Sequence, residues 1–361
     1  MRNSNAPLPH GGNVLHYSKK FGIPPGKIID FSASVNPLGP PKKSIAAMTR
    51  AFAELNRYPD PDSLELTAKI AALHKLKDGQ VLIGNGSTEF IYLLPRALGI
   101  KKALVLSPSF SDYERASEIS GAKVVRLPLL EENNFSPDMK TLSREIKKCG
   151  LLFLCNPNNP TGTLLPKGEL LGLLKEASKA GTVVCIDEAF IEYVPGGSVL
   201  KEAVKLGAVV LRNFTKFYGM PGIRIGYAAA DRRIIAKMKA IREPWTVNNL
   251  AQAAALAALG DREYVKKTLA QNEAERDYLF HGLSGTGWLL PFSSTANFLL
   301  VKILEPRISS SSLTARLASS GLLVRDCSTF PGLGQRFLRV AVLSRRENKK
   351  LVEALQSFTT P

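Results

Sequence analysis

Two side chains in the sequence could do chemistry that ordinary surface residues do not. Lys216 lies in the segment Asn213–Arg224 among aromatic and apolar neighbours, and a desolvated lysine has a lowered pKa and becomes a nucleophilic amine. Asp187 ends an apolar run, where a carboxylate is costly to bury unless a cation faces it. Because no basic residue adjoins Asp187, we expect its partner to be a distant side chain or a ligand, such as a protonated pyridine nitrogen.

Two further segments could bind an anion and fix polar groups. In Gly84–Glu89, Gly86 precedes the hydroxyls of Ser87 and Thr88 at the start of a predicted helix, where free N–H groups and the helix dipole favour negative charge. The segment Asn156–Gly162 is rich in Asn and Pro and predicts a rigid turn that presents amide side chains. Each feature alone has a structural alternative, because a hydroxyl can cap a helix, an Asn-Pro segment can be a plain turn and a lysine is usually solvated.

Short apolar runs that alternate with helical patterns must position these segments. The predicted strands are Val81–Gly84, Ala103–Leu106, Val124–Leu127, Leu151–Cys155, Val183–Asp187, Val209–Arg212 and Ile225–Ala229. Helical patterns between them include Glu89–Leu98, Pro166–Lys179 and Arg233–Arg242. The alternation predicts an α/β fold with three αβα layers and a mostly parallel sheet. Ligands of such sheets bind at the carboxyl ends of the strands, and all four segments lie there, so we expect a single site.

The requirements of one cofactor match this expected site. Pyridoxal 5'-phosphate needs a lysine for its Schiff base, a carboxylate on its ring nitrogen and a cup for its phosphate. Lys216, Asp187 and the Gly84–Glu89 segment would supply these three groups. We therefore predict pyridoxal phosphate as the cofactor.

Pattern changes along the chain predict three parts. Residues 1–40 are rich in Gly and Pro and predict an irregular arm that contributes to the small domain and the active site. Residues 41–250 are the predicted large, cofactor-binding domain, and residues 251–361 are the predicted small α+β domain. Helices expected in the last third are Asn249–Leu259, Asp261–Leu283, Ser309–Ser319 and Arg346–Phe358, and strands are Phe298–Val301, Leu322–Arg325 and Phe337–Val342.

Composition limits the class of protein. The 361 residues are 45% hydrophobic and 22% charged, a globular mixture that excludes a disordered or fibrous chain. The net charge is +17, but the basic residues are scattered pairs, so we predict no nucleic-acid partner. No apolar run suits a bilayer span or a signal peptide, so we predict no membrane partner and a cytoplasmic location. The four cysteines lack CxxC spacing, which suits reduced thiols rather than disulfides or a metal site.

The order and spacing of Asn156–Gly162, Asp187 and the segment from Lys216 to Arg224 resemble fold-type I pyridoxal-phosphate enzymes of the aspartate aminotransferase superfamily, over nearly the whole chain. The resemblance implies that Lys216 forms the Schiff base, that Asp187 pairs with the pyridine nitrogen and that Asn159 hydrogen-bonds the phenolic oxygen of the cofactor. Further residues implied to bind the cofactor are Phe110, stacked on the ring, and Gly86, Ser87, Thr88, Asn213, Thr215 and Arg224 around the phosphate. Many relatives have Ser at the position of Asn213. Tyr58 would reach the phosphate of the neighbouring subunit, which implies a homodimer with shared active sites.

Two branches of this superfamily resemble the chain: histidinol-phosphate aminotransferases and threonine-phosphate decarboxylases. Both act on phosphorylated amines. The segments that resemble the decarboxylases are His10–Asn13, Asp30–Pro41, Thr215–Tyr218, Pro244–Asn248 and Phe330–Leu333. Phe190 stands where the aminotransferases usually have a Tyr that donates to the phenolic oxygen, and the decarboxylase resemblance implies Phe there.

The decarboxylase resemblance implies loss of CO2 from L-threonine O-3-phosphate, which gives (R)-1-amino-2-propanol O-phosphate for cobalamin biosynthesis. A small substrate with a carboxylate and a phosphate needs two cationic contacts. Arg339 matches the superfamily's carboxylate-binding arginine, and Arg325 matches the arginine that holds the substrate phosphate in histidinol-phosphate enzymes. Further expected substrate contacts are His10, Asn36 and Asn159. A histidinol-phosphate aminotransferase and a serine-phosphate decarboxylase remain open alternatives. An aminotransferase-like DNA-binding regulator is not expected, because no such module precedes His10.

Overall fold

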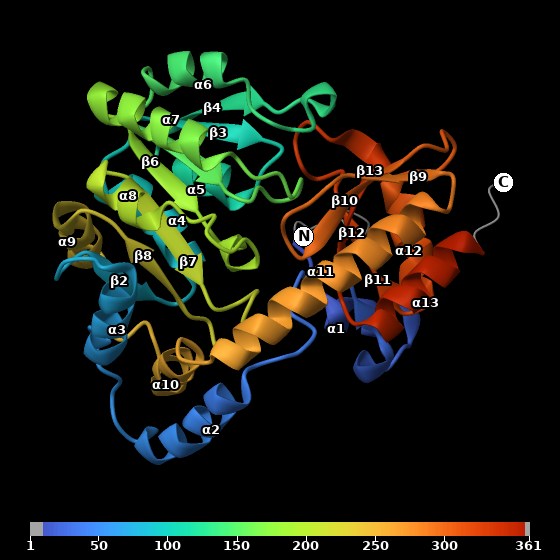
Figure 1. Cartoon of the computed structure of the whole chain (residues 1–361), viewed down its shortest axis with the longest axis horizontal. Coiled ribbons are helices and arrows are strands. Elements are labelled where there is room, and N and C mark those ends of the chain that lie inside the picture. Colours follow the sequence, from blue (N-terminus) through green and yellow to red (C-terminus); the bar gives the residue numbers. More distant parts are fainter. Residues whose placement is uncertain (1–9, 358–361) are drawn as a thin grey trace.

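A seven-stranded sheet forms the centre of the computed structural model, which describes residues 10–357 (Figure 1). The first nine residues of the predicted arm, and Phe358 of the last predicted helix, lie outside the described residues. The order of strands in this sheet is β2-β8-β7-β6-β5-β3-β4. Its strands are β2 Val81–Gly84, β3 Lys102–Ser107, β4 Lys123–Pro128, β5 Leu151–Cys155, β6 Val183–Asp187, β7 Val209–Asn213 and β8 Gly226–Ala229.

Strand direction confirms the predicted α/β class with a mostly parallel sheet. The neighbours from β4 to β7 are parallel, whereas β8 runs antiparallel to both β7 and β2. Alternate residues of β5 enter different hydrophobic clusters, with Leu152 and Leu154 in one and Leu151 and Phe153 in the other. Burial on both faces explains why these strands are continuous apolar runs in the sequence.

Helices lie on both sides of this sheet, and further helices surround the smaller part of the structure (Figure 1). Local signals set their ends: α7 starts after Pro166 and stops at Gly181, whose φ of 74° is the left-handed conformation that glycine adopts freely. The described helices are α1 Val14–Phe21, α2 Lys42–Ala51, α3 Leu64–His74, α4 Ser87–Ala97, α5 Asp112–Ile119, α6 Met139–Ile146, α7 Lys167–Ala180, α8 Leu200–Lys205, α9 Arg232–Ala240, α10 Asn249–Ala258, α11 Arg262–Ser284, α12 Ser310–Ser319 and α13 Arg345–Gln356.

A smaller four-stranded sheet, ordered β12-β13-β10-β9, lies beside the large one with α11, α12 and α13 around it (Figure 1). Its strands are β9 Leu289–Pro291, β10 Phe298–Ile303, β12 Arg325–Asp326 and β13 Phe337–Ala341. The predicted strand Leu322–Arg325 is in fact two strands, because β11 Leu322–Leu323 pairs instead with β1 Ile29–Asp30. This parallel pair joins the N-terminal arm to the smaller part. The division of the chain at residues 40 and 250 stays a prediction.

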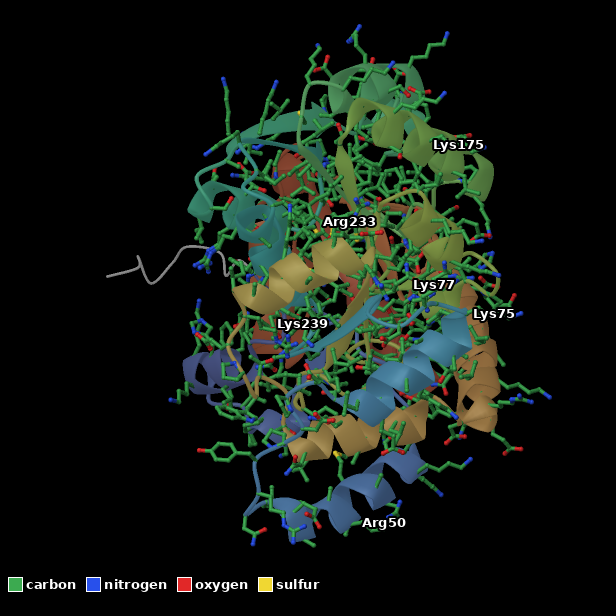
Figure 2. The ribbon with its side chains drawn as sticks, turned by 90° about the vertical axis from the view of Figure 1, so that its left-hand side faces the viewer. Arg50, Lys75, Lys77, Lys175, Arg233 and Lys239 are labelled. Carbon is green, nitrogen blue, oxygen red and sulfur yellow. The ribbon has the colours of Figure 1, made fainter. Side chains whose placement is uncertain are left out.

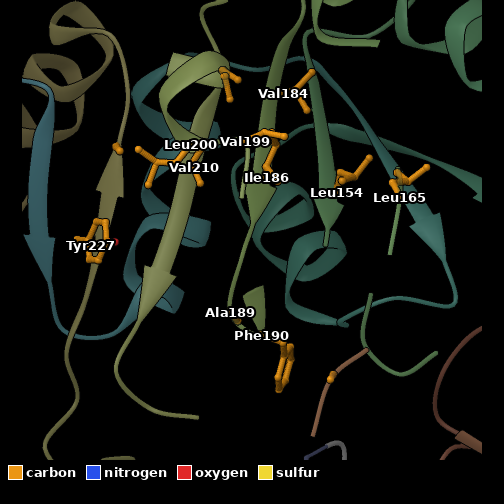
Figure 3. Close-up of a cluster of buried hydrophobic side chains, with 14 of the residues drawn as sticks. Leu154, Leu165, Val184, Ile186, Ala189, Phe190, Val199, Leu200, Val210 and Tyr227 are labelled. Carbon is orange, nitrogen blue, oxygen red and sulfur yellow. The ribbon is translucent and has the colours of Figure 1, made fainter. Parts of the chain in front are cut away.

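One hydrophobic cluster extends from the strands of the large sheet, past the carboxyl end of β6, to the smaller sheet (Figure 3). Val184 and Ile186 of β6 pack there with Val210 of β7. Phe190, just beyond β6, lies edge-on to Phe298 of β10, with ring centroids 5.0 Å apart. The cluster therefore holds the carboxyl end of β6 against the smaller sheet.

Positive charge is spread widely over the surface. Figure 2 shows labelled basic side chains far apart on one face, from Arg50 on α2 to Lys175 on α7. All four cysteines are buried and unpaired. Within residues 10–357, no helix has the length and apolar character to cross a membrane.

Candidate active site

A cavity of about 240 Å³ lies at the carboxyl ends of β5, β6 and β7, beside β12 and β13 of the smaller sheet. The predicted site residues that line it are His10, Ser87, Thr88, Phe110, Asn159, Asp187, Asn213, Thr215, Lys216, Arg224, Arg325 and Arg339. Gly86, Asn36 and Tyr58 are not among the lining residues. The structure thus brings most of the predicted residues together, while their roles stay predictions.

The carboxylate of Asp187 is buried in the wall of this cavity, with 5% of the residue exposed. Its Oδ2 accepts a hydrogen bond from the Tyr113 hydroxyl (2.7 Å), and its Oδ1 accepts one from the backbone N–H of Ala189 (3.1 Å). Burial raises the pKa of Asp187 to about 6, while these two hydrogen bonds oppose the rise. Each oxygen keeps a lone pair, so the carboxylate can still accept a hydrogen bond from a cationic ring nitrogen.

The amine of Lys216 lies in the same cavity and donates to the backbone carbonyl of Ala33 (2.8 Å). Burial, followed by the positive charges of Arg339 and Arg224, lowers the pKa of Lys216 to about 7. Near neutral pH a substantial share of this amine is therefore unprotonated. An unprotonated amine is the form that condenses with an aldehyde.

The start of α4 and the Arg224 side chain form a pocket suited to an anion. Gly86 has φ +81°, and a Cβ at this position would lie 2.5 Å from Nη2 of Arg224, so only glycine permits this approach. Asn213 donates to the Ser87 hydroxyl (3.4 Å) and accepts from the Thr215 N–H (3.0 Å). Arg224 makes no hydrogen bond or ion pair within residues 10–357, which leaves its guanidinium available to a phosphate.

Arg339 of β13 presents a second guanidinium, buried to 7% exposure. Its Nη1 donates to Oδ1 of Asn159, and its Nη2 donates to the carbonyl of Ser32 (2.7 Å). Its Nε is buried and has no partner among the described residues. Burial lowers the pKa of Arg339 to about 10, so it is still charged at neutral pH. An unpartnered buried N–H is costly, and a substrate carboxylate would satisfy it.

Arg325 of β12 is the cross-strand partner of Arg339 in the antiparallel β12–β13 pair. It is also buried, at 5% exposure, and its Nη2 donates to the Thr329 hydroxyl (2.6 Å). Its guanidinium lies 5.2 Å from the centre of the Phe330 ring. Like charges directly opposite each other destabilise a sheet, so this pair is suited to a ligand that carries more than one negative charge.

An aromatic group borders the cavity near Asp187. The Phe110 ring lies 5.9 Å from the His10 ring and edge-on to Tyr113 at 5.6 Å. Tyr113 is fully buried and stacks on Phe153 at 5.0 Å. Tyr113 was not predicted from the sequence, because no motif marks it beyond its position three residues after Phe110. It is the one side chain whose hydroxyl contacts Asp187 among the described residues.

Asn36, a predicted substrate contact, lies outside the residues that line the cavity, and its contact with substrate stays a prediction. Its Nδ2 is within hydrogen-bonding distance of the Phe217 carbonyl (2.7 Å) and of the Tyr264 and Thr268 hydroxyls (2.9 and 3.0 Å). The amide is therefore used inside the fold and does not line the cavity. Tyr58 is 80% exposed, and its ring lies 4.8 Å from that of Trp245. Its expected role at the site of a second subunit stays a prediction.

These contacts fit pyridoxal phosphate. Lys216 can take its aldehyde, Asp187 can face its ring nitrogen, and Ser87, Thr88 and Arg224 can hold its phosphate beside Gly86. Arg224 lies close to Gly86, where a Cβ would be in its way, and makes no ion pair among the described residues. An anionic group such as the phosphate would provide its missing partner.

Comparisons with known proteins agree with this geometry. The family model for class I and II aminotransferases matches residues 26–355. A provisionally named threonine-phosphate decarboxylase of Caldanaerobacter subterraneus subsp. tengcongensis is 38% identical, covering 98% of this chain and 94% of the relative. The threonine-phosphate decarboxylase of Salmonella typhimurium is 34% identical, covering 97% and 96%. A histidinol-phosphate aminotransferase of Moorella thermoacetica is also 34% identical, covering 98% and 90%.

Solved structures similar to this one come from the same two groups of enzymes. The histidinol-phosphate aminotransferase of Clostridium acetobutylicum has a TM-score of 0.84 at 33% identity, covering 90% of this chain and 97% of that one. The L-threonine-O-3-phosphate decarboxylase of Porphyromonas gingivalis has a TM-score of 0.80 at 25% identity, covering 91% and 98%. The chain therefore belongs to the class I and II aminotransferases, with the fold-type I architecture and the pyridoxal phosphate cofactor of that family.

Proposed function

We propose that the chain decarboxylates L-threonine O-3-phosphate to (R)-1-amino-2-propanol O-phosphate, as a cytoplasmic enzyme of cobalamin biosynthesis. The observation that carries this proposal is the pairing of Arg325 with Arg339 in one wall of the cavity. Two buried arginines that line the same cavity favour a substrate with two anionic groups, and this substrate has a carboxylate and a phosphate. Two of the relatives above bear the name of this activity.

The protein groups would divide the work of binding. Arg339 would bind the carboxylate, through its free Nε, and Arg325 would bind the phosphate, with His10 at the edge of the cavity. Asn159 accepts from Arg339 through Oδ1, which leaves its Nδ2 to donate to the phenolic oxygen of the cofactor. One side chain would thus link substrate binding to cofactor binding.

Bound pyridoxal phosphate supplies an electron sink for the electron pair left when a bond to the amine-bearing carbon breaks. The Asp187 carboxylate would hold a proton on the ring nitrogen and so favour that electron flow. Arg339 would influence which bond breaks, because its guanidinium would fix where the substrate carboxylate lies in the cavity. After CO2 leaves, the Lys216 ammonium can deliver the proton that replaces it on this carbon.

Phe190 favours the decarboxylase over the aminotransferase. It is 3% exposed and packs against Phe298, so an apolar ring occupies the position of the hydroxyl donor that aminotransferases of this superfamily usually have. Asn159 would then be the donor to the phenolic oxygen.

We also infer a homodimer in which Tyr58 completes the site of the partner subunit. Tyr58 belongs to a segment with other exposed apolar side chains, Phe52 and Leu55, and it contacts the half-exposed Trp245. Exposed aromatic and aliphatic groups gathered in one region are typical of an interface between subunits.

Product analysis tests the reaction directly. The purified holoenzyme is incubated separately with threonine phosphate, with serine phosphate, and with histidinol phosphate plus 2-oxoglutarate. We expect CO2 and aminopropanol phosphate from threonine phosphate, and no keto acid. Glutamate formed from histidinol phosphate, without CO2 from either phosphoamino acid, would establish the aminotransferase instead. Faster CO2 release from serine phosphate would reassign the substrate.

A further inference from the structure

The segment Asp30–Asn36, called the strap below, connects the smaller sheet to the cofactor lysine. Four consecutive carbonyls of the strap each accept a hydrogen bond. The pairs are Phe31 O with Ala341 N (2.8 Å), Ser32 O with Arg339 Nη2 (2.7 Å), Ala33 O with Lys216 Nζ (2.8 Å) and Ser34 O with Asn297 Nδ2 (2.9 Å). Neighbouring carbonyls thus contact the proposed nucleophile and the proposed carboxylate-binding arginine.

Lys216 contacts the strap through its side-chain amine and through its backbone carbonyl. Its Nζ donates to the carbonyl of Ala33, and its backbone carbonyl accepts from the N–H of Asn36 (3.0 Å). The next carbonyl of the lysine loop, that of Phe217, accepts from the Asn36 side chain (2.7 Å). Two residues of the strap, three positions apart, therefore hold both the main chain and the amine of Lys216.

Asn36 is itself firmly held. It is 5% exposed, its Oδ1 accepts from the N–H of Leu38 (3.0 Å), and its Nδ2 lies beside the Tyr264 and Thr268 hydroxyls of α11. α11 is the long helix that crosses the molecule from the region of α10 toward the smaller sheet (Figure 1). The strap and the lysine loop are thereby fixed against one rigid element.

We propose that the strap positions Lys216 for its reaction with the cofactor, and that Asn36 is the positioning residue that keeps strap and lysine loop together. The inference rests on Lys216 being the cofactor lysine. A lysine side chain has many rotamers, and ordering it has a large entropic cost. The Ala33 carbonyl selects a rotamer that places the amine in the cavity before the cofactor arrives, which is the condition for fast reaction. The same carbonyl offers a fixed acceptor whenever the amine is not bonded to the cofactor.

The test compares cofactor capture in apoprotein variants. Asn36→Ala removes the side chain that joins strap and loop, and Asn297→Ala is the matched control, a buried Asn that bonds the strap at the Ser34 carbonyl but makes no hydrogen bond to the lysine loop among the described residues. Stopped-flow absorbance follows formation of the coloured covalent adduct with pyridoxal phosphate, and borohydride trapping with mass spectrometry locates it. We expect capture to be about tenfold slower in Asn36→Ala and within about twofold of wild type in Asn297→Ala.

A second readout separates positioning from general damage. Pyridoxine 5'-phosphate has an alcohol in place of the aldehyde, so it fills the site without reacting with Lys216. Its affinity is expected to stay within about threefold of wild type in Asn36→Ala. Slower capture accompanied by an equal loss of analogue binding would overturn the proposal, as would capture at the wild-type rate.

Two further results of these experiments would also be informative: failure of Asn36→Ala to fold, and the position of the trapped adduct. If Asn36→Ala does not fold, Thr268→Val can be used instead, because it removes one hydrogen-bond partner of the Asn36 amide with little change in side-chain shape. We expect cofactor capture in this variant to be about two- to fivefold slower, with unchanged analogue binding. Capture at the wild-type rate would refute the role of the strap. An adduct trapped in wild type on a lysine other than Lys216 would refute the proposed site itself, whereas trapping at Lys216 with no effect of either variant would refute the strap alone.

Discussion

The hydroxyl of Tyr113 donates a hydrogen bond to Oδ2 of Asp187 over 2.7 Å, and both side chains are buried. Burial keeps the pKa of Tyr113 well above 10, so this hydroxyl retains its proton throughout the physiological range. It therefore acts as a permanent donor, and it opposes the burial that raises the pKa of Asp187 to about 6. The tyrosine thus helps to keep Asp187 ionised, which is the form that its proposed role at the cofactor ring nitrogen requires.

Replacing Tyr113 by Phe should make cofactor binding more sensitive to acid. Without the donor the pKa of Asp187 rises further, so the ionised form, which is the form that could pair with the ring nitrogen, is lost at a higher pH. A hydrogen bond to a charged group contributes about 1.5 kcal/mol, which corresponds to about one pH unit. We expect the acidic midpoint of cofactor affinity to move upward by that amount, measured by fluorescence titration between pH 5 and 8.

Tyr193→Phe is the matched control for that experiment. Tyr193 is also buried, but its hydroxyl points to the carbonyl of Lys216 at 3.5 Å rather than to Asp187. The acidic midpoint of this control should equal that of wild type. Equal midpoints in wild type and Tyr113→Phe would show that the tyrosine does not tune the acid.

The large sheet was accessible to sequence reasoning because buried parallel strands are pure apolar runs. The predicted bounds Val81–Gly84, Leu151–Cys155 and Val183–Asp187 are those of β2, β5 and β6. In contrast, β1 and β9 are two and three residues long, too short for any periodicity, and were not predicted.

The site was partly accessible for a related reason. Residues directly after strands were predicted because parallel topology brings them to one edge. Contacts between distant side chains and backbone carbonyls have no signature in the sequence, which is why the bonds of Lys216 to Ala33 and of Asn36 to Phe217 were missed. The pairing of Arg325 with Arg339 likewise depends on strand register, which the sequence does not reveal.

The lowered pKa of Lys216 makes the capture of pyridoxal phosphate by apoprotein depend on pH. Only the unprotonated amine attacks the aldehyde, and with a pKa of about 7 its fraction rises from about one tenth at pH 6 to about nine tenths at pH 8. We expect the capture rate to rise about tenfold over this interval, followed by visible absorbance. A rate that keeps rising toward pH 10 would indicate an ordinary exposed lysine, and Lys216→Ala should show no trapped adduct at this position.

Removal of the Arg339 guanidinium should weaken binding of the substrate more than binding of the cofactor. A charged hydrogen-bond pair contributes about 1.5–3 kcal/mol, so Arg339→Ala should lower kcat/KM for threonine phosphate by about 10- to 150-fold. Arg336→Ala is the control, because Arg336 bonds the carbonyl of Ile303 and does not line the cavity. Equal kinetics for Arg339→Ala and wild type would remove this arginine from the substrate site.

A buried ion pair behind the site should contribute strongly to stability. Arg212 of β7 bonds the buried Glu188 (2.9 Å) and the half-buried Glu192 (3.0 Å), and Arg212→Met would leave both carboxylates without this cation. Breaking a buried pair costs about 3–5 kcal/mol, which should appear as a lower urea midpoint for unfolding of the apoprotein. Arg126→Met, which breaks an exposed pair with Glu114, should change stability by less than about 1 kcal/mol. Similar midpoints for the two variants would contradict the assigned importance of the buried pair.

Mixed dimers can determine whether Tyr58 acts in the site of its own subunit or in that of the partner. One chain carries Lys216→Ala and the other carries Tyr58→Ala, with different affinity tags so that the heterodimer is purified. If Tyr58 acts across the interface, the chain that keeps Lys216 receives an intact Tyr58 from its partner, and one site per dimer is of wild-type composition. We then expect one tight cofactor site per two chains, measured by titration of the visible adduct. If Tyr58 acts within its own subunit, every site lacks one of the two residues, and the heterodimer binds no more tightly than the Tyr58→Ala homodimer.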